Sequence, residues 1–175
     1  MIRILLVDDH AILREGLGAL LSYYPDVEVV GEAEDGLQAI EYVESLSPDI
    51  VLMDIAMPGM NGLKATRRIR QKHPNIHVLI LTQYEDQPYV LNLLRAGVSG
   101  YVLKRALGVD LINALRAVAR GARVSSTPLW RQLSWNSFAN LIKVPYRMLR
   151  HSHRASRKSC TGWPLVRPAD RSRLP

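Results

Sequence analysis

Four charged side chains in this sequence stand directly after short apolar runs. Asp8 and Asp9 follow the first run, Asp54 follows a second, and Lys104 follows a third. If these runs are neighbouring parallel strands, their charged ends converge in the crevice beyond the carboxyl edge of the sheet, where open α/β folds bind their ligands. Three carboxylates gathered there would repel one another unless a metal cation and the lysine compensated their charge. The pattern predicts a Mg²⁺-dependent phosphorylation site.

The elements that must position these residues alternate between strand and helix. Short runs rich in Val, Ile and Leu are typical of parallel strands covered on both faces, and they span residues 4–7, 27–33, 50–53, 78–81 and 101–103. In the second run valines alternate with Glu28 and Glu32, which indicates an edge strand.

Five helices are expected between and after these strands, and two of them show a clear apolar face. The first face consists of Leu13, Leu17, Leu20 and Leu21, and the second of Leu111, Ala114, Leu115, Val118 and Ala119. Pro, Gly, Asn and Asp pairs punctuate the connections, and Gly121 is suited to cap the last helix. Strand and helix repetition with short connections predicts a doubly wound, right-handed α/β sheet.

Several motifs in order resemble the receiver domain of bacterial response regulators, most closely its NarL/LuxR-type branch. They are Val7-Asp8-Asp9-His10, the segment from Asp54 through Pro58-Gly59 to Asn61-Gly62, Leu81-Thr82, and Gly100-Tyr101-Val102-Leu103-Lys104. The resemblance covers residues 1–121. It implies a flavodoxin-like (CheY-like) fold with five parallel strands in the order 2-1-3-4-5.

The resemblance makes Asp54 the phosphoacceptor, which takes a phosphoryl group from a histidine kinase or from acetyl phosphate. Lys104 would neutralise the acyl phosphate, and Thr82 would donate its hydroxyl to it. Thr82 and Tyr101 would then act as the switch that reports phosphorylation.

The resemblance also implies a Mg²⁺ site. Asp8 and Asp9 would hold the ion directly or through water, and Asp54 and the backbone carbonyl of Ala56 would complete the protein ligands. This small oxygen set suits Mg²⁺, which keeps several waters and binds phosphate oxygens.

Each residue also has a plainer interpretation. Asp9 is a good helix N-cap residue, Asp54 could be a turn residue, and Lys104 could be a solvated strand end. Thr82 is an ordinary strand residue, and Tyr101 taken alone fits a core position. Three histidines show no metal-ligand spacing and are expected in loops or on the surface: His10, His73 and His77.

A haloacid-dehalogenase-like phosphatase is the rival from the enzyme class, because it also uses a strand-end aspartate as its nucleophile. Such enzymes resemble one another in an Asp-x-Asp motif, whereas Ala56 stands two residues after Asp54. The missing carboxylate removes the general acid. We therefore expect a phosphoacceptor with at most slow autodephosphorylation, and not an enzyme.

The 175 residues carry a net charge of +7, but this charge is unevenly distributed. Residues 1–123 carry −2 and residues 124–175 carry +9. Cys160 is the only cysteine, so no internal disulfide can form, and a reducing compartment is expected. The sequence has no signal-peptide core and no apolar run of membrane length, which predicts a cytoplasmic protein without membrane contact.

Residues 122–175 have neither helical nor strand periodicity. We predict a receiver domain at 1–121, followed by a linker and a basic, poorly structured tail without an intact helix-turn-helix domain. Our hypothesis is a frameshift: residues 151–166, retranslated one base out with suitable synonymous codons, become LTPREQEVLHWLAAG. That string resembles the opening of a LuxR-type helix-turn-helix domain.

The partners follow from these two parts of the chain. The resemblance implies a sensor histidine kinase, a homodimer through the switch face, and DNA contacted through an intact output domain. The alternative is that the tail, with the sequence it has, is itself a binding segment. Its ten basic residues with interleaved tryptophans would then bind nucleic acid weakly and without sequence preference.

Overall fold

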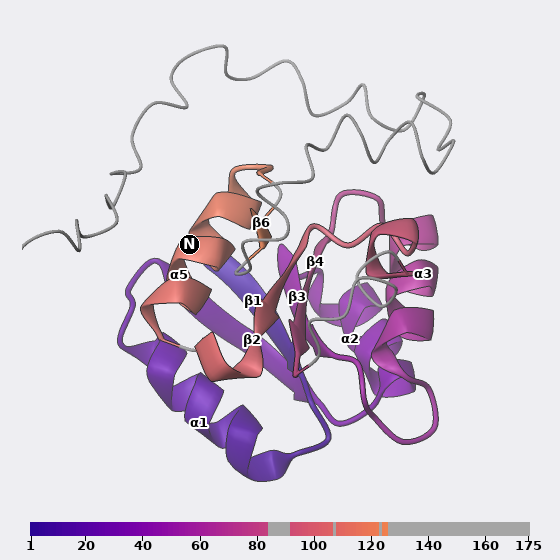
Figure 1. Ribbon diagram of the computed structural model, residues 1–175, viewed down its shortest axis with the longest axis horizontal. Coiled ribbons are helices and arrows are strands. Elements are labelled where there is room, and N and C mark those ends of the chain that lie inside the picture. The colour runs from indigo at the N-terminus through magenta and orange to yellow at the C-terminus, as the bar shows by residue number, and fades with distance from the viewer. Residues whose placement is uncertain (84–91, 107, 123, 126–175) are drawn as a thin grey trace, which may run out of the picture. The chain divides into compact units, whose positions relative to one another are not determined.

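A parallel sheet runs through the computed structural model, with helices on both of its faces (Figure 1). The structure describes residues 1–83, 92–106, 108–122 and 124–125. The predicted strands are all present, each within two residues of its expected bounds: β1 Ile2–Val7, β2 Val27–Ala33, β3 Ile50–Asp54, β4 His77–Thr82 and β5 Gly100–Leu103.

The strand order β2-β1-β3-β4-β5 confirms the prediction, and every pair is parallel. Within the described part β2 pairs only with β1, as its alternating pattern indicated. A sixth strand, β6 Val124–Ser125, was not predicted, because two residues are too few to show a period. The Val124 amide donates to the Ser99 carbonyl at 3.1 Å. A Cβ at Gly100 would overlap the Val124 carbonyl oxygen, so a glycine is needed for this approach.

The described helices are α1 Ala11–Ser22, α2 Gly36–Leu46, α3 Gly62–Lys72 and α5 Val109–Ala119, with a 3₁₀ turn η1 at Lys104–Ala106. Residues 92–95 are also helical. The start of the helix expected after Glu85, and the tail from residue 126 onward, lie outside the described residues.

Alternate strand residues point to opposite faces and build two cores. Leu5, Val51, Met53 and Ile80 pack toward α2 and α3. Ile4, Leu6, Leu52 and Leu79 pack toward α1 and α5. Burial on both faces is why the strands are continuously apolar.

The apolar helix faces are largely as predicted, with one error. Leu17 and Leu21 of α1 are fully buried. On α5, Ala119 is exposed, whereas Ile112, which was not assigned to the apolar face, is buried. Gly121 follows the helix with φ of +78° and donates its amide to the Val118 carbonyl, which confirms the expected cap.

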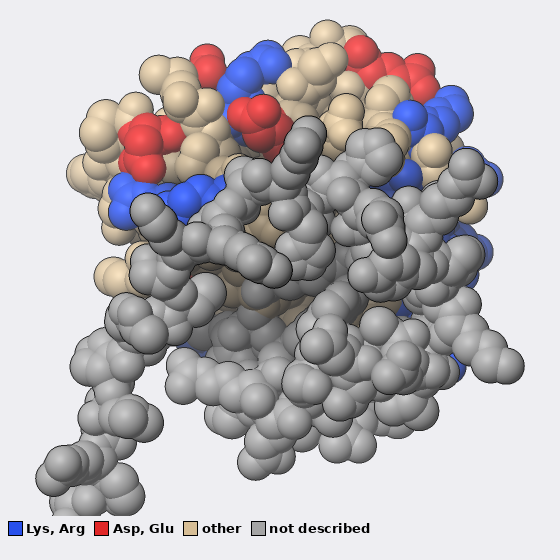
Figure 2. Space-filling model, turned by 90° about the horizontal axis from the view of Figure 1, so that it is seen from above, with Lys and Arg blue, Asp and Glu red and all other residues tan. Residues whose placement is uncertain are grey.

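The visible surface of the described part carries mixed charge, with acidic and basic side chains side by side (Figure 2). This agrees with the near balance of charge in residues 1–123. No helix among the described residues is long and apolar enough to span a bilayer.

Candidate functional site

The strand register brings the predicted residues to one edge of the sheet. Val7 pairs with Met53, Asp54 pairs with Leu81, and Thr82 pairs with Leu103. Asp8, Asp54, Thr82 and Lys104 therefore stand at the same carboxyl edge, each supplied by a different strand end. The convergence expected from the spacing of the charged residues is confirmed by this register.

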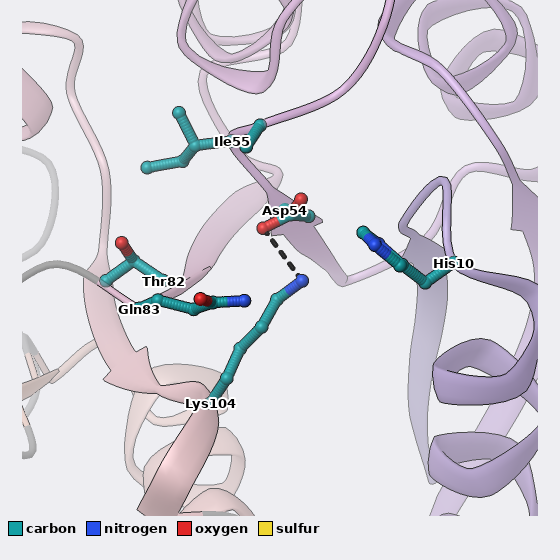
Figure 3. A pocket seen from close by; sticks show the side chains of 7 residues that line it. His10, Asp54, Ile55, Thr82, Gln83 and Lys104 are labelled. Atoms are coloured by element: carbon teal, nitrogen blue, oxygen red, sulfur yellow. Dashed lines mark ion pairs between the residues drawn. The ribbon is translucent and has the colours of Figure 1, made fainter.

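Lys104 connects the two buried carboxylates. Its Nζ donates to Asp8 Oδ2 at 2.7 Å and lies 3.1 Å from Asp54 Oδ1 (Figure 3). Asp8 is 1% exposed and Asp54 is 3% exposed. Buried charges are tolerated only when they are paired, so Lys104 is a required partner of both acids and not a solvated strand end.

The electrostatics of the pocket raise the pKa of both Asp54 and Lys104. Burial raises the pKa of the Asp54 carboxyl above its ordinary value, and the charge of Asp8 adds to this, while Lys104 acts in the opposite direction. Burial would lower the pKa of Lys104, but its hydrogen bonds to Asp8 and Asp54 outweigh burial and raise it. The pocket has an excess of negative charge that one lysine does not fully compensate.

Two carboxylate oxygens in this pocket lack a hydrogen bond. Asp54 Oδ2 is buried and has no hydrogen-bond partner among the described residues. Asp9 Oδ1 makes none either, although it lies 3.0 Å from His10 Nδ1. Orphaned buried oxygens in an acidic pocket fit a hard divalent cation, which binds carboxylate and carbonyl oxygens. The residues present therefore fit Mg²⁺.

His10 is a pocket residue that the sequence analysis did not identify. It precedes α1 and its side chain is exposed, as expected, but its ring also lines the pocket and contacts two acids. Asp8, Asp9 and His10 each offer an atom within 4.8 Å of the others, an arrangement able to hold a metal ion. His10, and not Asp9, is the N-cap residue of α1, and its side chain makes no cap hydrogen bond. The only sequence signal was its position next to the acid pair.

Arg14 was also missed. Its Nη1 donates to the Asp8 backbone carbonyl at 2.6 Å, and its Nε lies 3.5 Å from Glu32 Oε2. The arginine stands on α1 and therefore fixes the end of β1 from the helix side. Sequence spacing gives no hint of this contact, because a helical arginine is usually a solvated residue.

The loop after β3 is held close to Asp54. Gly62 donates its amide to the Ile55 carbonyl at 3.1 Å, and a Cβ at Gly62 would overlap the Asp54 carbonyl oxygen. Asn61 caps α3 by accepting from the Lys64 amide at 3.0 Å. These backbone contacts fix both ends of the loop, and Ala56 within the loop lines the pocket.

The pocket is small and open to one side. It has a volume of about 70 Å³ and is lined by His10, Asp54, Ile55, Ala56, Thr82, Gln83 and Lys104. Drug-sized ligand sites occupy roughly 300–1,000 Å³, so this one is suited to a small group such as a phosphoryl group. Tyr101 does not reach it: the side chain is completely buried in the core.

Comparison with known proteins finds a matching family model and similar proteins. The family model for the response regulator receiver domain matches residues 4–116. The transcriptional regulatory protein DegU of Brevibacillus brevis is 45% identical over 120 residues, which cover 69% of this chain and 51% of DegU. The response regulator GacA of Pseudomonas viridiflava is 41% identical over 138 residues, which cover 79% of this chain and 64% of GacA.

A solved structure shows the same likeness. The crystal structure of a LuxR-family two-component response regulator from Aurantimonas sp. SI85-9A1 matches with a TM-score of 0.69 and 37% identity. The match covers 81% of this chain and 98% of that one. The chain spans between half and two thirds of the length of the curated relatives DegU and GacA.

Proposed function

Because the chain belongs to the response regulator receiver family, we propose that Asp54 accepts a phosphoryl group from the histidine kinase of a two-component system. The observation that carries this proposal is Asp54 Oδ2, a buried carboxylate oxygen without a hydrogen bond, in a pocket beside a lysine. An oxygen that is held in place and lacks a partner is available as a nucleophile.

The transfer needs little besides position and charge. Asp54 Oδ2 attacks phosphorus in line with the leaving group, the bond from phosphorus to the donor nitrogen or oxygen breaks, and an acyl phosphate forms on the aspartate. The Lys104 ammonium, 3.1 Å from Asp54 Oδ1, would neutralise the charge on the transferred group. Thr82, which lines the pocket, would donate its hydroxyl to a phosphate oxygen.

The acid pocket is proposed to bind Mg²⁺ through Asp8, Asp9, Asp54 and the Ala56 carbonyl. The ion would supply charge neutralisation for the phosphoryl oxygens. Asp8 would supply one carboxylate oxygen to the ion, and its other oxygen would stay hydrogen-bonded to Lys104. Arg14 holds the Asp8 backbone through a hydrogen bond to its carbonyl. No second carboxylate stands where an aspartyl phosphatase needs its acid, so we propose phosphoacceptance with slow loss of the phosphate and no turnover of a substrate.

Signalling is proposed to pass through Thr82 and Tyr101. Tyr101 pairs with Ile80 of β4, two residues before Thr82, so the two side chains belong to neighbouring strands. The Tyr101 ring is fully buried. A phosphate that draws in Thr82 would stabilise this buried position of the ring.

The output is proposed to be control of transcription, because DegU and a second relative are both transcriptional regulatory proteins. The family match covers residues 4–116 and supports a receiver-based regulator over a protein that acts through a basic tail alone. The frameshift hypothesis concerns residues outside the described part. Sequencing the coding DNA around residues 127–135 tests it directly, since a second open frame must encode the helix-turn-helix segment.

Phosphorylation is tested by incubating the full chain with acetyl phosphate and Mg²⁺ and measuring intact mass. One phosphoryl group is expected, and Asp54→Asn should abolish it. Asp110→Asn, an exposed acid in the first turn of α5, is the matched control and should still be labelled. Persistent labelling of Asp54→Asn at another single residue would overturn the assignment.

A further inference from the structure

His10 places an imidazole nitrogen against the acid pair at the mouth of the pocket. Its Nδ1 lies 3.1 Å from Asp8 Oδ1 and 3.0 Å from Asp9 Oδ1. In Figure 3 the ring extends from the start of α1 toward Asp54 and Lys104, on the opposite side of the pocket from Thr82. The pocket is thus not bounded by oxygen ligands alone.

These separations fit ligands of one metal ion. Transition metals bind histidine nitrogen and carboxylate oxygen at about 2.0–2.2 Å, so two ligands at right angles around the ion stand roughly 3.0 Å apart. The nitrogen is at that distance from an oxygen of each acid. All three ligand atoms lie within 4.8 Å of one another, which is close enough for them to share one ion.

The other contacts of the acids leave room for an ion. Asp8 Oδ2 accepts from Lys104, whereas Oδ1 accepts from the His10 backbone amide at 2.9 Å and keeps a second lone pair toward the His10 ring. The buried Asp54 Oδ2, which has no hydrogen bond within the described part, lies in the same pocket. The His10 side chain is 64% exposed, so Nε2 can carry the ring proton toward water while Nδ1 turns to a metal.

We propose that His10 determines which divalent cations the acid pocket prefers, by adding a nitrogen ligand for transition metals that Mg²⁺ does not use. This inference rests on the metal site of the proposed function. Mg²⁺ takes oxygen ligands and water, whereas imidazole suits Co²⁺, Ni²⁺ and Zn²⁺. When His10 binds a transition metal, its nitrogen would occupy one coordination position, which is then not available to water or to a phosphoryl oxygen.

The experiment is a metal titration of the full chain by calorimetry, with Co²⁺ and Mg²⁺ as the probes. Only the bound Co²⁺ that excess Mg²⁺ displaces is included in the comparison, which excludes ions bound elsewhere on the chain. His10→Ala should weaken this Co²⁺ binding by about tenfold or more and leave Mg²⁺ binding unchanged. The visible spectrum of the displaceable Co²⁺ should also change, because its ligand field loses a nitrogen.

His73→Ala is the matched control, because His73 is the C-cap residue of α3 and contributes nothing to the pocket lining. Circular dichroism of each variant shows whether it is folded. Unchanged Co²⁺ binding in folded His10→Ala, or an equal loss for Co²⁺ and Mg²⁺, would overturn the role of His10. Failure of the unaltered chain to bind Mg²⁺ would instead remove the metal site of the proposed function, and this inference with it.

Discussion

Lys104 Nζ donates a 2.7 Å hydrogen bond to Asp8 Oδ2 across 96 positions of sequence. The same ammonium lies 3.1 Å from Asp54 Oδ1, so it joins the end of β5 to the ends of β1 and β3. Among the described residues it is the only lysine or arginine whose side chain pairs with these two buried carboxylates. The stability of the metal-free domain should therefore depend on it.

Replacing Lys104 with Met should destabilise the metal-free protein by about 3–5 kcal/mol, because two buried carboxylates lose their charged partner. Chemical denaturation with a chelator present measures this loss. Added Mg²⁺ should restore part of it by supplying another cation. Lys64→Met, on the exposed face of α3, is the control and should change stability by less than about 0.5 kcal/mol. Equal effects of the two variants would show that Lys104 is not the compensating charge.

Asp54→Asn should raise the stability of the metal-free protein at neutral pH by about 1–3 kcal/mol, since it removes a buried charge whose second oxygen has no hydrogen bond. The pKa of Asp54 is raised in the folded state. The raised pKa of Asp54 therefore adds to the free energy of unfolding. This stabilisation is fully present below the ordinary pKa of 3.8 and is lost as pH rises through the folded pKa. The gain from the substitution should accordingly disappear in acid. Thermal melts from acid to neutral pH test this, and a gain of equal size at every pH would contradict it.

Many residues of this pocket could be predicted from the sequence, and those that could not were missed for physical reasons. The buried parallel strands are continuously apolar, so their ends, and with them Asp54 and Lys104, could be located. His10 and Arg14 were missed because their contacts depend on where α1 begins and how it is rotated. The β5–β6 pairing depends on a close backbone approach at Gly100, which no pattern of side chains reports.

A second charge contact links α5 to the loop before β2, and it predicts a pH dependence. The Nε and Nη2 atoms of Arg116 donate to the two Asp26 carboxylate oxygens, each at 2.8 Å. The Arg116 hydrogen bond lowers the pKa of Asp26 below its ordinary value of 3.8. This stabilisation is present above that value and is lost as pH falls through the lower folded pKa.

Asp26→Asn should therefore lower the melting temperature at neutral pH and have no effect in strong acid, where the carboxyl is protonated in both states. The substitution leaves Arg116 over the Tyr24 ring, 5.6 Å from its centre, so the cation–π contact contributes to the stability of both proteins. Melts of both proteins across acidic pH measure the difference. A difference that persists at the lowest pH would mean that packing, and not charge, is responsible.

Gly62→Ala should disturb both stability and phosphorylation, because the added Cβ would overlap the backbone of the phosphoacceptor Asp54 and come within 2.9 Å of Met53 Cγ. Forced shifts of this kind cost about 1–3 kcal/mol, and here they would displace the nucleophile. Gly16→Ala is the matched control: Gly16 lies within α1 with nothing within 4 Å of the new Cβ. It should stabilise the protein by up to about 1 kcal/mol through helix propensity. Denaturation and labelling with acetyl phosphate test both variants. Normal labelling of Gly62→Ala would show that the Asp54 backbone tolerates the movement.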